Sequence, residues 1–148
     1  MLEEKGSIIY TNVGVSMMPL LRQRKDIIEI RKKETERCNK YDVVLYKREN
    51  RYILHRILRV LPDGYIIAGD HNVFIETDIK DKDILGVMTR VIRDGKTITP
   101  DNIGYKIYVH LWCDCYPLRM HLLRKKWKLQ RIWGKIKLCI LKLIRKQR

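Results

Sequence analysis

Three side chains in the first half of the sequence are of the types that nucleophilic acyl transfer requires. Ser16 lies in a Gly-Val-Ser-Met-Met-Pro segment, His55 is followed by an arginine, and Asp70 follows a glycine. A serine hydroxyl is a weak nucleophile unless a base accepts its proton, and a carboxylate that orients this base makes it more effective. The residues therefore predict Ser16 as nucleophile, His55 as general base and Asp70 as the carboxylate that orients the imidazole.

The segment that carries His55 has the alternation of a β-strand. Odd-numbered residues of 52–61 share one face, and they place His55 between Ile53 and Ile57. Apolar neighbours favour a neutral imidazole, which can accept a proton. Arg56 is expected to point to the opposite face.

The turn that follows this strand brings His55 near the Asp70 segment. A four-residue loop over 61–64 would pair Val60 with Tyr65, and this register puts His55 opposite Asp70. A shorter loop would put it opposite one of the next two residues, a histidine and an asparagine. Opposed Cβ atoms lie only ~5 Å apart, so each register leaves this segment within reach of the imidazole. The argument relates His55 to Asp70 and does not by itself place Ser16.

The rest of the sequence predicts an antiparallel sheet followed by a helix. Short β-branched and aromatic runs alternate with charged or glycine-containing turns, and we expect strands at Asp26–Arg31, Tyr41–Tyr46, Tyr52–Leu61, Tyr65–Ala68 and Ile84–Ile92. From Pro117 onward one helical stripe contains Leu118, Leu122, Leu129, Trp133, Ile136, Ile140 and Leu143. We therefore expect a catalytic domain over 1–112 and a basic amphipathic helical tail over 113–148.

The positive charge of the chain is concentrated in this tail. The formal net charge is +15, but residues 117–148 hold 12 Lys or Arg and no acid, so residues 1–116 carry only +3. Together with Trp127 and Trp133, this composition predicts a helix that lies on an anionic membrane surface. Nucleic acid is a less favoured partner, because a phosphate binder does not need a continuous apolar stripe. The structural alternative is a stripe that packs on the protein's own sheet.

Export and metal-binding signals are not found in the sequence. The first residues lack the basic start and apolar stretch of a secretory signal, and no run approaches the ~20 apolar residues of a membrane span. We expect a cytoplasmic protein, or one peripheral at the cytoplasmic membrane face. Cys38, Cys113, Cys115 and Cys139 are irregularly spaced, so we expect thiols rather than disulfides. No further ligands accompany Cys113 and Cys115, and neither a metal nor another cofactor is expected.

Several segments resemble the signal peptidase I family, and most closely its branch in which histidine replaces the catalytic lysine. The matching segments are residues 14–21, 41–46, 55–57, 69–70 and 84–86, and they follow the family's order over residues 7–99. The Ser-Met-x-Pro segment is the most specific of them. The resemblance implies a mostly β fold, an antiparallel sheet coiled into a partial barrel. It implies peptide hydrolysis by Ser16 and His55, with Asp70 matching the aspartate of the family's Gly-Asp segment. The substrate would be an extended peptide with small side chains just before the cleaved bond.

The resemblance also implies an oxyanion and substrate-binding region around Gly14 and Met17, where the backbone N–H of Ser16 would help to hold the oxyanion. Some members carry a hydroxyl two residues before the nucleophile, and Gly14 lacks it. Lys47 is the alternative base, because lysine serves in much of the family. It precedes Arg48 at a charged hairpin, where a lysine stays solvated, so His55 is preferred.

The sequence therefore predicts a serine endopeptidase that cleaves leader or signal-type peptides. The alternative is a catalytically inactive peptide-binding or scaffold module that the basic tail recruits to the membrane. Self-cleaving repressors share the implied fold, but the sequence before Ser16 leaves no room for a DNA-binding domain and its cleavage segment. We therefore expect no self-cleaving repressor.

Overall fold

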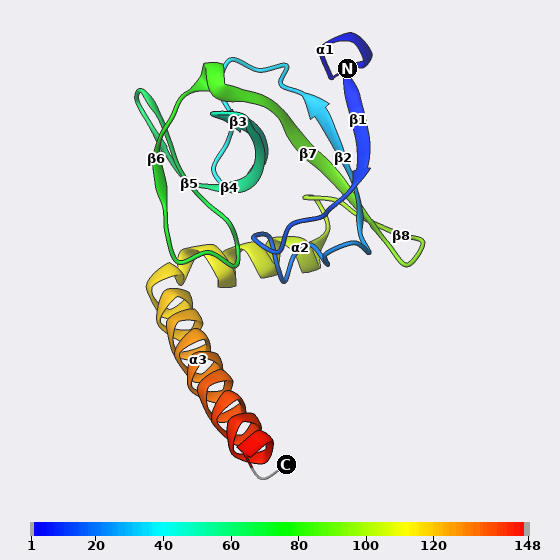
Figure 1. The fold of residues 1–148 in the computed structure, drawn as a ribbon. Coiled ribbons are helices and arrows are strands. Elements are labelled where there is room, and N and C mark those ends of the chain that lie inside the picture. Colours follow the sequence, from blue (N-terminus) through cyan, green and yellow to red (C-terminus); the bar gives the residue numbers. More distant parts are fainter. Residues whose placement is uncertain (1, 147–148) are drawn as a thin grey trace. The chain divides into compact units, whose positions relative to one another are not determined.

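A single antiparallel sheet is the main element of the first part of the chain, and a long helix follows it (Figure 1). The computed structural model describes residues 2–146, and side chains at positions 2 and 4–138. Its elements are α1 (Leu2–Lys5), β1 (Ser7–Thr11), β2 (Ile27–Lys32), β3 (Val43–Arg48), β4 (Arg51–Leu61), β5 (Gly64–Ala68), β6 (Glu76–Ile79), a 3-10 turn (Asp81–Asp83), β7 (Ile84–Arg93), β8 (Lys96–Ile98), α2 (Ile103–Val109), a π-helical turn (His110–Asp114) and α3 (Tyr116–Lys146).

The strand order in the sheet is β1-β2-β7-β3-β4-β5-β6, and β8 pairs with the end of β7. All pairs are antiparallel, and β1 and β6 are open edges, so the sheet does not close on itself. The five expected strands are present as β2, β3, β4, β5 and β7, with ends that differ by at most two residues. The mostly β prediction with a C-terminal helix is therefore confirmed.

The β4–β5 hairpin has the predicted register near its turn and another register near His55. Val60 pairs with Tyr65, as the loop length predicted. A β-bulge between Ile57 and Arg59 then shifts the ladder by one residue, so that Arg56 pairs with Ala68. Because β5 ends at Ala68, the predicted pairing of His55 with Asp70 is wrong. A bulge adds one unpaired residue to one strand, and no turn-forming residue in this part of the sequence indicated it.

Both faces of β4 are buried, which explains how two adjacent polar residues come to lie inside the protein. Leu54 belongs to a core cluster that also contains Tyr105 of α2, whereas Ile57 belongs to a second cluster with Tyr46. Arg56 lies on the α2 side and has no exposed surface, and His55 on the opposite face is 6% exposed. Arg56 thus points away from His55 as expected, but into a second core rather than into solvent.

The chain divides into two compact units, 1–115 and 116–148. The boundary predicted from the sequence lies three residues earlier, after residue 112. The second unit contains α3, whose described stripe residues are exposed: Leu118, Leu122, Leu129, Trp133 and Ile136. Ile140, Leu143 and Cys139 lie outside the described side chains. Among the described residues, no helix combines the length and apolar character that a membrane crossing requires.

Candidate active site

Ser16 lies in the loop after β1 and contacts the corner formed by residues 69–72. Its carbonyl oxygen accepts a hydrogen bond from the backbone N–H of His71 at 2.7 Å. Gly69 permits this approach, because a Cβ at that position would lie 2.6 Å from the Ser16 oxygen and 2.9 Å from Nδ2 of Asn72. The glycine before Asp70 is therefore required by close contact with the serine loop.

His55 is held on β4 by a carboxylate that the sequence did not single out. Its Nδ1 lies 2.9 Å from Oε1 of Glu76 and 3.1 Å from the hydroxyl of Tyr46. A carboxylate only accepts hydrogen bonds, so Nδ1 carries the proton and Nε2 keeps its lone pair. Burial lowers the pKa of His55 below its ordinary value of 6.5, although the negative charge of Glu76 acts to raise it. The imidazole is therefore neutral near pH 7, with Nε2 able to accept a proton.

Glu76, the first residue of β6, is kept ionised by its own partners. The Tyr46 hydroxyl donates to Oε1 at 2.7 Å, and the Arg48 guanidinium donates to Oε2 at 2.8 Å. Burial alone would raise the pKa of Glu76, but these hydrogen bonds and the attraction of His55 hold the pKa below its ordinary value of 4.5. An ionised carboxylate on Nδ1 fixes the tautomer and stabilises the imidazolium that forms when His55 takes a proton.

Asp70 does not form the predicted bond to His55. Its carboxylate is fully buried and accepts two hydrogen bonds from Arg56, at 2.9 and 2.8 Å, and one from the Tyr108 hydroxyl at 2.8 Å. The indole N–H of Trp112 donates to its carbonyl oxygen at 2.8 Å. Glu76 thus takes the orienting position, and Asp70 fixes the 69–72 corner to the helical segment that follows the sheet.

Residues of the corner contact both Ser16 and His55, but these two residues form no hydrogen bond with each other. Nδ2 of Asn72 lies 3.3 Å from Nε2 of His55, the ring nitrogen that the Ser16 hydroxyl would have to reach. Within the described part of the chain, the Ser16 hydroxyl has no hydrogen-bond partner. Hydrogen bonds of a catalytic group are commonly long or incomplete before substrate binds. For the serine to reach His55, the Asn72 amide must move away from Nε2.

A cleft of about 950 Å³ reaches Ser16 and follows β1. Gly14 and Ser16 both line it. Met17, predicted at the same region, is 1% exposed as a whole residue, packs in the core with Leu21 and does not line the cleft, so the prediction that it contacts a substrate is wrong.

Lys47, His110 and Cys115 have no hydrogen bond to Ser16, His55 or Glu76 among the described residues. Lys47 is exposed near the end of β3. His110 bonds to Asp114 at 2.8 Å between Nδ1 and a carboxylate oxygen, and His121 is an exposed residue of α3. Cys113 is buried and Cys115 is exposed. Among the residues that are described, no group of three or more His, Cys, Asp or Glu side chains is arranged to hold a metal ion.

Gly14 offers a direct test of oxyanion binding. A Cβ built there meets only the Ser16 hydroxyl oxygen, at 4.0 Å, and its φ lies outside the left-handed region, so a side chain is accommodated without strain. If Ser16 is the nucleophile, as the sequence predicts, we expect Gly14→Ser to raise kcat by about tenfold, because one oxyanion donor changes kcat by 10²–10³ when its geometry is optimal. Gly14→Ala is the matched control and should leave kcat within about twofold of the original. Equal kcat values in the two variants would contradict the prediction.

Comparison of the sequence with protein-family models gives no match, and comparison with curated proteins gives none either.

Proposed function

We propose that this protein is a serine endopeptidase of the signal peptidase I type, in which Ser16 is the nucleophile, His55 the general base and Glu76 the carboxylate that orients and supports His55. The observation that carries the proposal is the orientation of the His55 imidazole. Its Nδ1 is bonded to Glu76 at 2.9 Å, and its Nε2 faces the corner that contacts the Ser16 loop. This is the arrangement that a general base for a serine requires.

Each step of the proposed reaction uses a group of this site. Asn72 leaves Nε2, the Ser16 hydroxyl takes its place, and its oxygen attacks the peptide carbonyl carbon as its proton passes to His55. The backbone N–H of Ser16 stabilises the oxyanion. The imidazolium, supported by Glu76, then donates its proton to the leaving amine as the C–N bond breaks. Water, deprotonated by His55, then attacks the acyl-enzyme, the ester bond between the acyl carbon and the Ser16 oxygen breaks to release the second product, and the imidazolium returns the proton to the Ser16 oxygen.

The substrate and location of the proposed enzyme follow from the cleft and the tail. The cleft suits a peptide in extended conformation. The resemblance to signal peptidases further implies a preference for small side chains just before the cleaved bond. The 12 cationic residues of 117–148 would hold the protein at an anionic membrane surface. Each basic residue near such a surface contributes ~1 kcal/mol, so a part of them would suffice. We place the enzyme at the cytoplasmic face of the membrane, where it processes leader or signal-type peptides.

A second candidate function is peptide binding without catalysis. The position of the Asn72 amide on Nε2 of His55 favours it, because this amide occupies the place of the serine hydroxyl. In that function the cleft and the tail would serve to hold a peptide at the membrane.

Incubation of the full chain with leader-type peptides, followed by mass spectrometry, distinguishes these functions. We expect cleavage at one peptide bond that disappears in both Ser16→Ala and His55→Ala. A product that persists in Ser16→Ala would remove this serine from the mechanism. Binding of the same peptides with no product would support the non-catalytic function.

A further inference from the structure

The cleft has two chemically different ends. Ser16 lies beyond the last residue of β1, whereas the backbone N–H of Lys32 bonds to the carbonyl of Gly6, just before the first. Ile8 and Tyr10 line the cleft between these points. A five-residue strand spans ~14 to 17 Å at ~3.4 Å per residue, so the part of the cleft along β1 accommodates about five residues of an extended peptide between its serine end and its lysine end.

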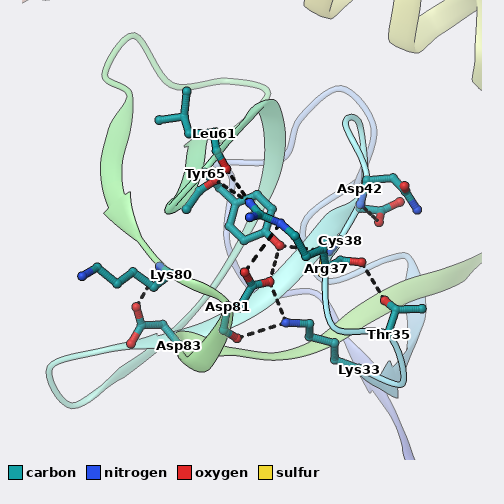
Figure 2. Close-up of polar contacts among 12 residues, drawn as sticks. Lys33, Thr35, Arg37, Cys38, Asp42, Leu61, Tyr65, Lys80, Asp81 and Asp83 are labelled. Atoms are coloured by element: carbon teal, nitrogen blue, oxygen red, sulfur yellow. Dashed lines mark hydrogen bonds and ion pairs between the residues drawn. The ribbon is translucent and has the colours of Figure 1, made fainter.

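Lysines provide all of the charge on the cleft wall. Of the described residues that line the cleft, only Lys32, Lys33 and Lys82 are charged. Figure 2 shows the Lys33 ammonium directed at Asp81, and its Nζ lies 2.8 Å from the carboxylate, so its charge is compensated. Lys32 and Lys82 are exposed, and no described carboxylate pairs with either of them. The far end of the cleft therefore carries two lysines that form no ion pair with a described carboxylate, although Lys82 lies between Asp81 and Asp83 in the sequence.

The wall between Ser16 and the lysines is apolar. It contains Ile8, Tyr10, Leu45, Leu54, Ile84 and Leu85. The outer edge of β1 has no strand partner in the sheet, so its backbone groups can bond to an extended peptide. An apolar segment thus fits the middle of the cleft, and a negatively charged group fits its far end.

We propose that the cleft selects extended peptides that carry an acidic residue about five positions from the cleaved bond, with apolar residues between. The inference rests on the proposed function for the position of the cleaved bond. The acidic side chain would form exposed ion pairs with Lys32 and Lys82, whereas the apolar residues would contact the wall between Ser16 and the lysines. Such ion pairs are individually weak, and two of them change binding by about fivefold at low salt.

A peptide series measures this selectivity. The probes are peptides of Ala, Leu and Val with Ala-Leu-Ala at the cleaved bond and one Asp-Asp pair moved stepwise along either side. We expect kcat/KM to be about fivefold higher when the pair lies about five residues from the bond than for the Ser-Ser counterpart. The difference should decrease with added salt.

Enzyme variants assign the effect to the two lysines. We expect the double variant Lys32→Gln, Lys82→Gln to cleave acidic and neutral peptides equally, and Lys32→Glu, Lys82→Glu to prefer peptides with a Lys-Lys pair. Lys25→Gln with Lys96→Gln is the matched control, because both are exposed lysines that do not line the cleft. Equal kcat/KM for acidic and neutral peptides in the unaltered enzyme, or the same loss of preference in the control, would overturn the inference.

Binding separates this inference from the proposed function. The Ser16→Ala protein is titrated with the same peptides bearing a fluorophore, and anisotropy gives Kd. If Ser16→Ala binds peptides with the Asp-Asp pair more tightly than neutral ones, but the unaltered protein cleaves no peptide, the inference is retained and the proposed hydrolase is rejected. If the unaltered protein cleaves the peptides, but the Kd values of Ser16→Ala are the same with and without the Asp-Asp pair, the inference is rejected and the hydrolase is retained.

Discussion

Glu76→Gln is expected to lower kcat for peptide cleavage by about 10²- to 10⁴-fold. The glutamine amide can donate to Nδ1 of His55, which moves the imidazole proton to Nε2 and removes the lone pair that must accept the serine proton. It also carries no charge to stabilise the imidazolium. The measurement is kcat on one cleaved peptide at a pH where the unaltered enzyme has its full activity.

The same variant should change the pH profile in a definite direction. The proposed mechanism requires neutral His55, so kcat/KM is expected to rise as pH increases through the pKa of this residue, which burial holds below 6.5. The charge of Glu76 acts to raise this pKa. Its removal therefore lowers the pKa further and moves the acid limb of the residual activity to lower pH. A shift toward higher pH would contradict this electrostatic role.

Arg48 supplies the control for Glu76. It donates to the oxygen of Glu76 that does not contact His55, and its side chain is largely exposed. Arg48→Gln keeps the carboxylate and its bond to Nδ1, so we expect kcat to fall by less than about tenfold. Similar losses in Arg48→Gln and Glu76→Gln would mean that the ion pair, rather than the orientation of His55, determines activity.

The sequence predicted the part of the site that depends on alternation along one strand. His55 lies on a buried face and Arg56 on the opposite face because successive side chains of a strand alternate. The turn before Tyr65 also set its pairing with Val60 correctly. These features are local, and the residues that determine them are adjacent in the sequence.

The orienting carboxylate could not be predicted in the same way. Asp70 matched a family segment and would face His55 in an unbroken ladder, but the bulge after Ile57 removes that register. Glu76 reaches His55 because β6 pairs with β5, where it lies opposite Ile67. Its strand is short and has two acidic residues, which are depleted in strands, so the pattern did not indicate β6. The only sequence signal was an acidic residue six positions after Asp70.

The burial of Arg56 likewise depends on a distant element. Tyr105 of α2 accepts a hydrogen bond from this guanidinium at 3.0 Å, and Tyr108 of the same helix donates to its partner Asp70. Alternation predicted the face on which Arg56 lies. It could not indicate that a helix some fifty residues later covers this face. A buried ion pair held by two helical tyrosines is a tertiary feature, and its role is to attach the 69–72 corner to α2.

Asp70→Asn is therefore expected to reduce stability more than chemistry. Arg56 has no exposed surface, and the substitution leaves its charge in the core without a carboxylate. Breaking one side of such a buried pair costs about 3–5 kcal/mol of unfolding free energy. For a unit of this size the corresponding decrease in Tm is roughly 10–20 °C. Thermal and urea unfolding followed by far-UV circular dichroism measure both quantities, with Asp63→Asn in an exposed turn as the control, expected to change stability by less than about 0.5 kcal/mol.

Substitution of the two carboxylates is expected to have opposite effects in the activity assay and the unfolding assay. Well below its Tm, Asp70→Asn should retain more activity than Glu76→Gln, because the bond between His55 and Glu76 does not involve Asp70. Glu76→Gln should unfold at a higher temperature than Asp70→Asn, because Glu76 is partly exposed and its arginine partner is at the surface. If Asp70→Asn instead abolished cleavage with an unchanged Tm, the orienting role would return to Asp70, and the contact between Glu76 and His55 would be structural only.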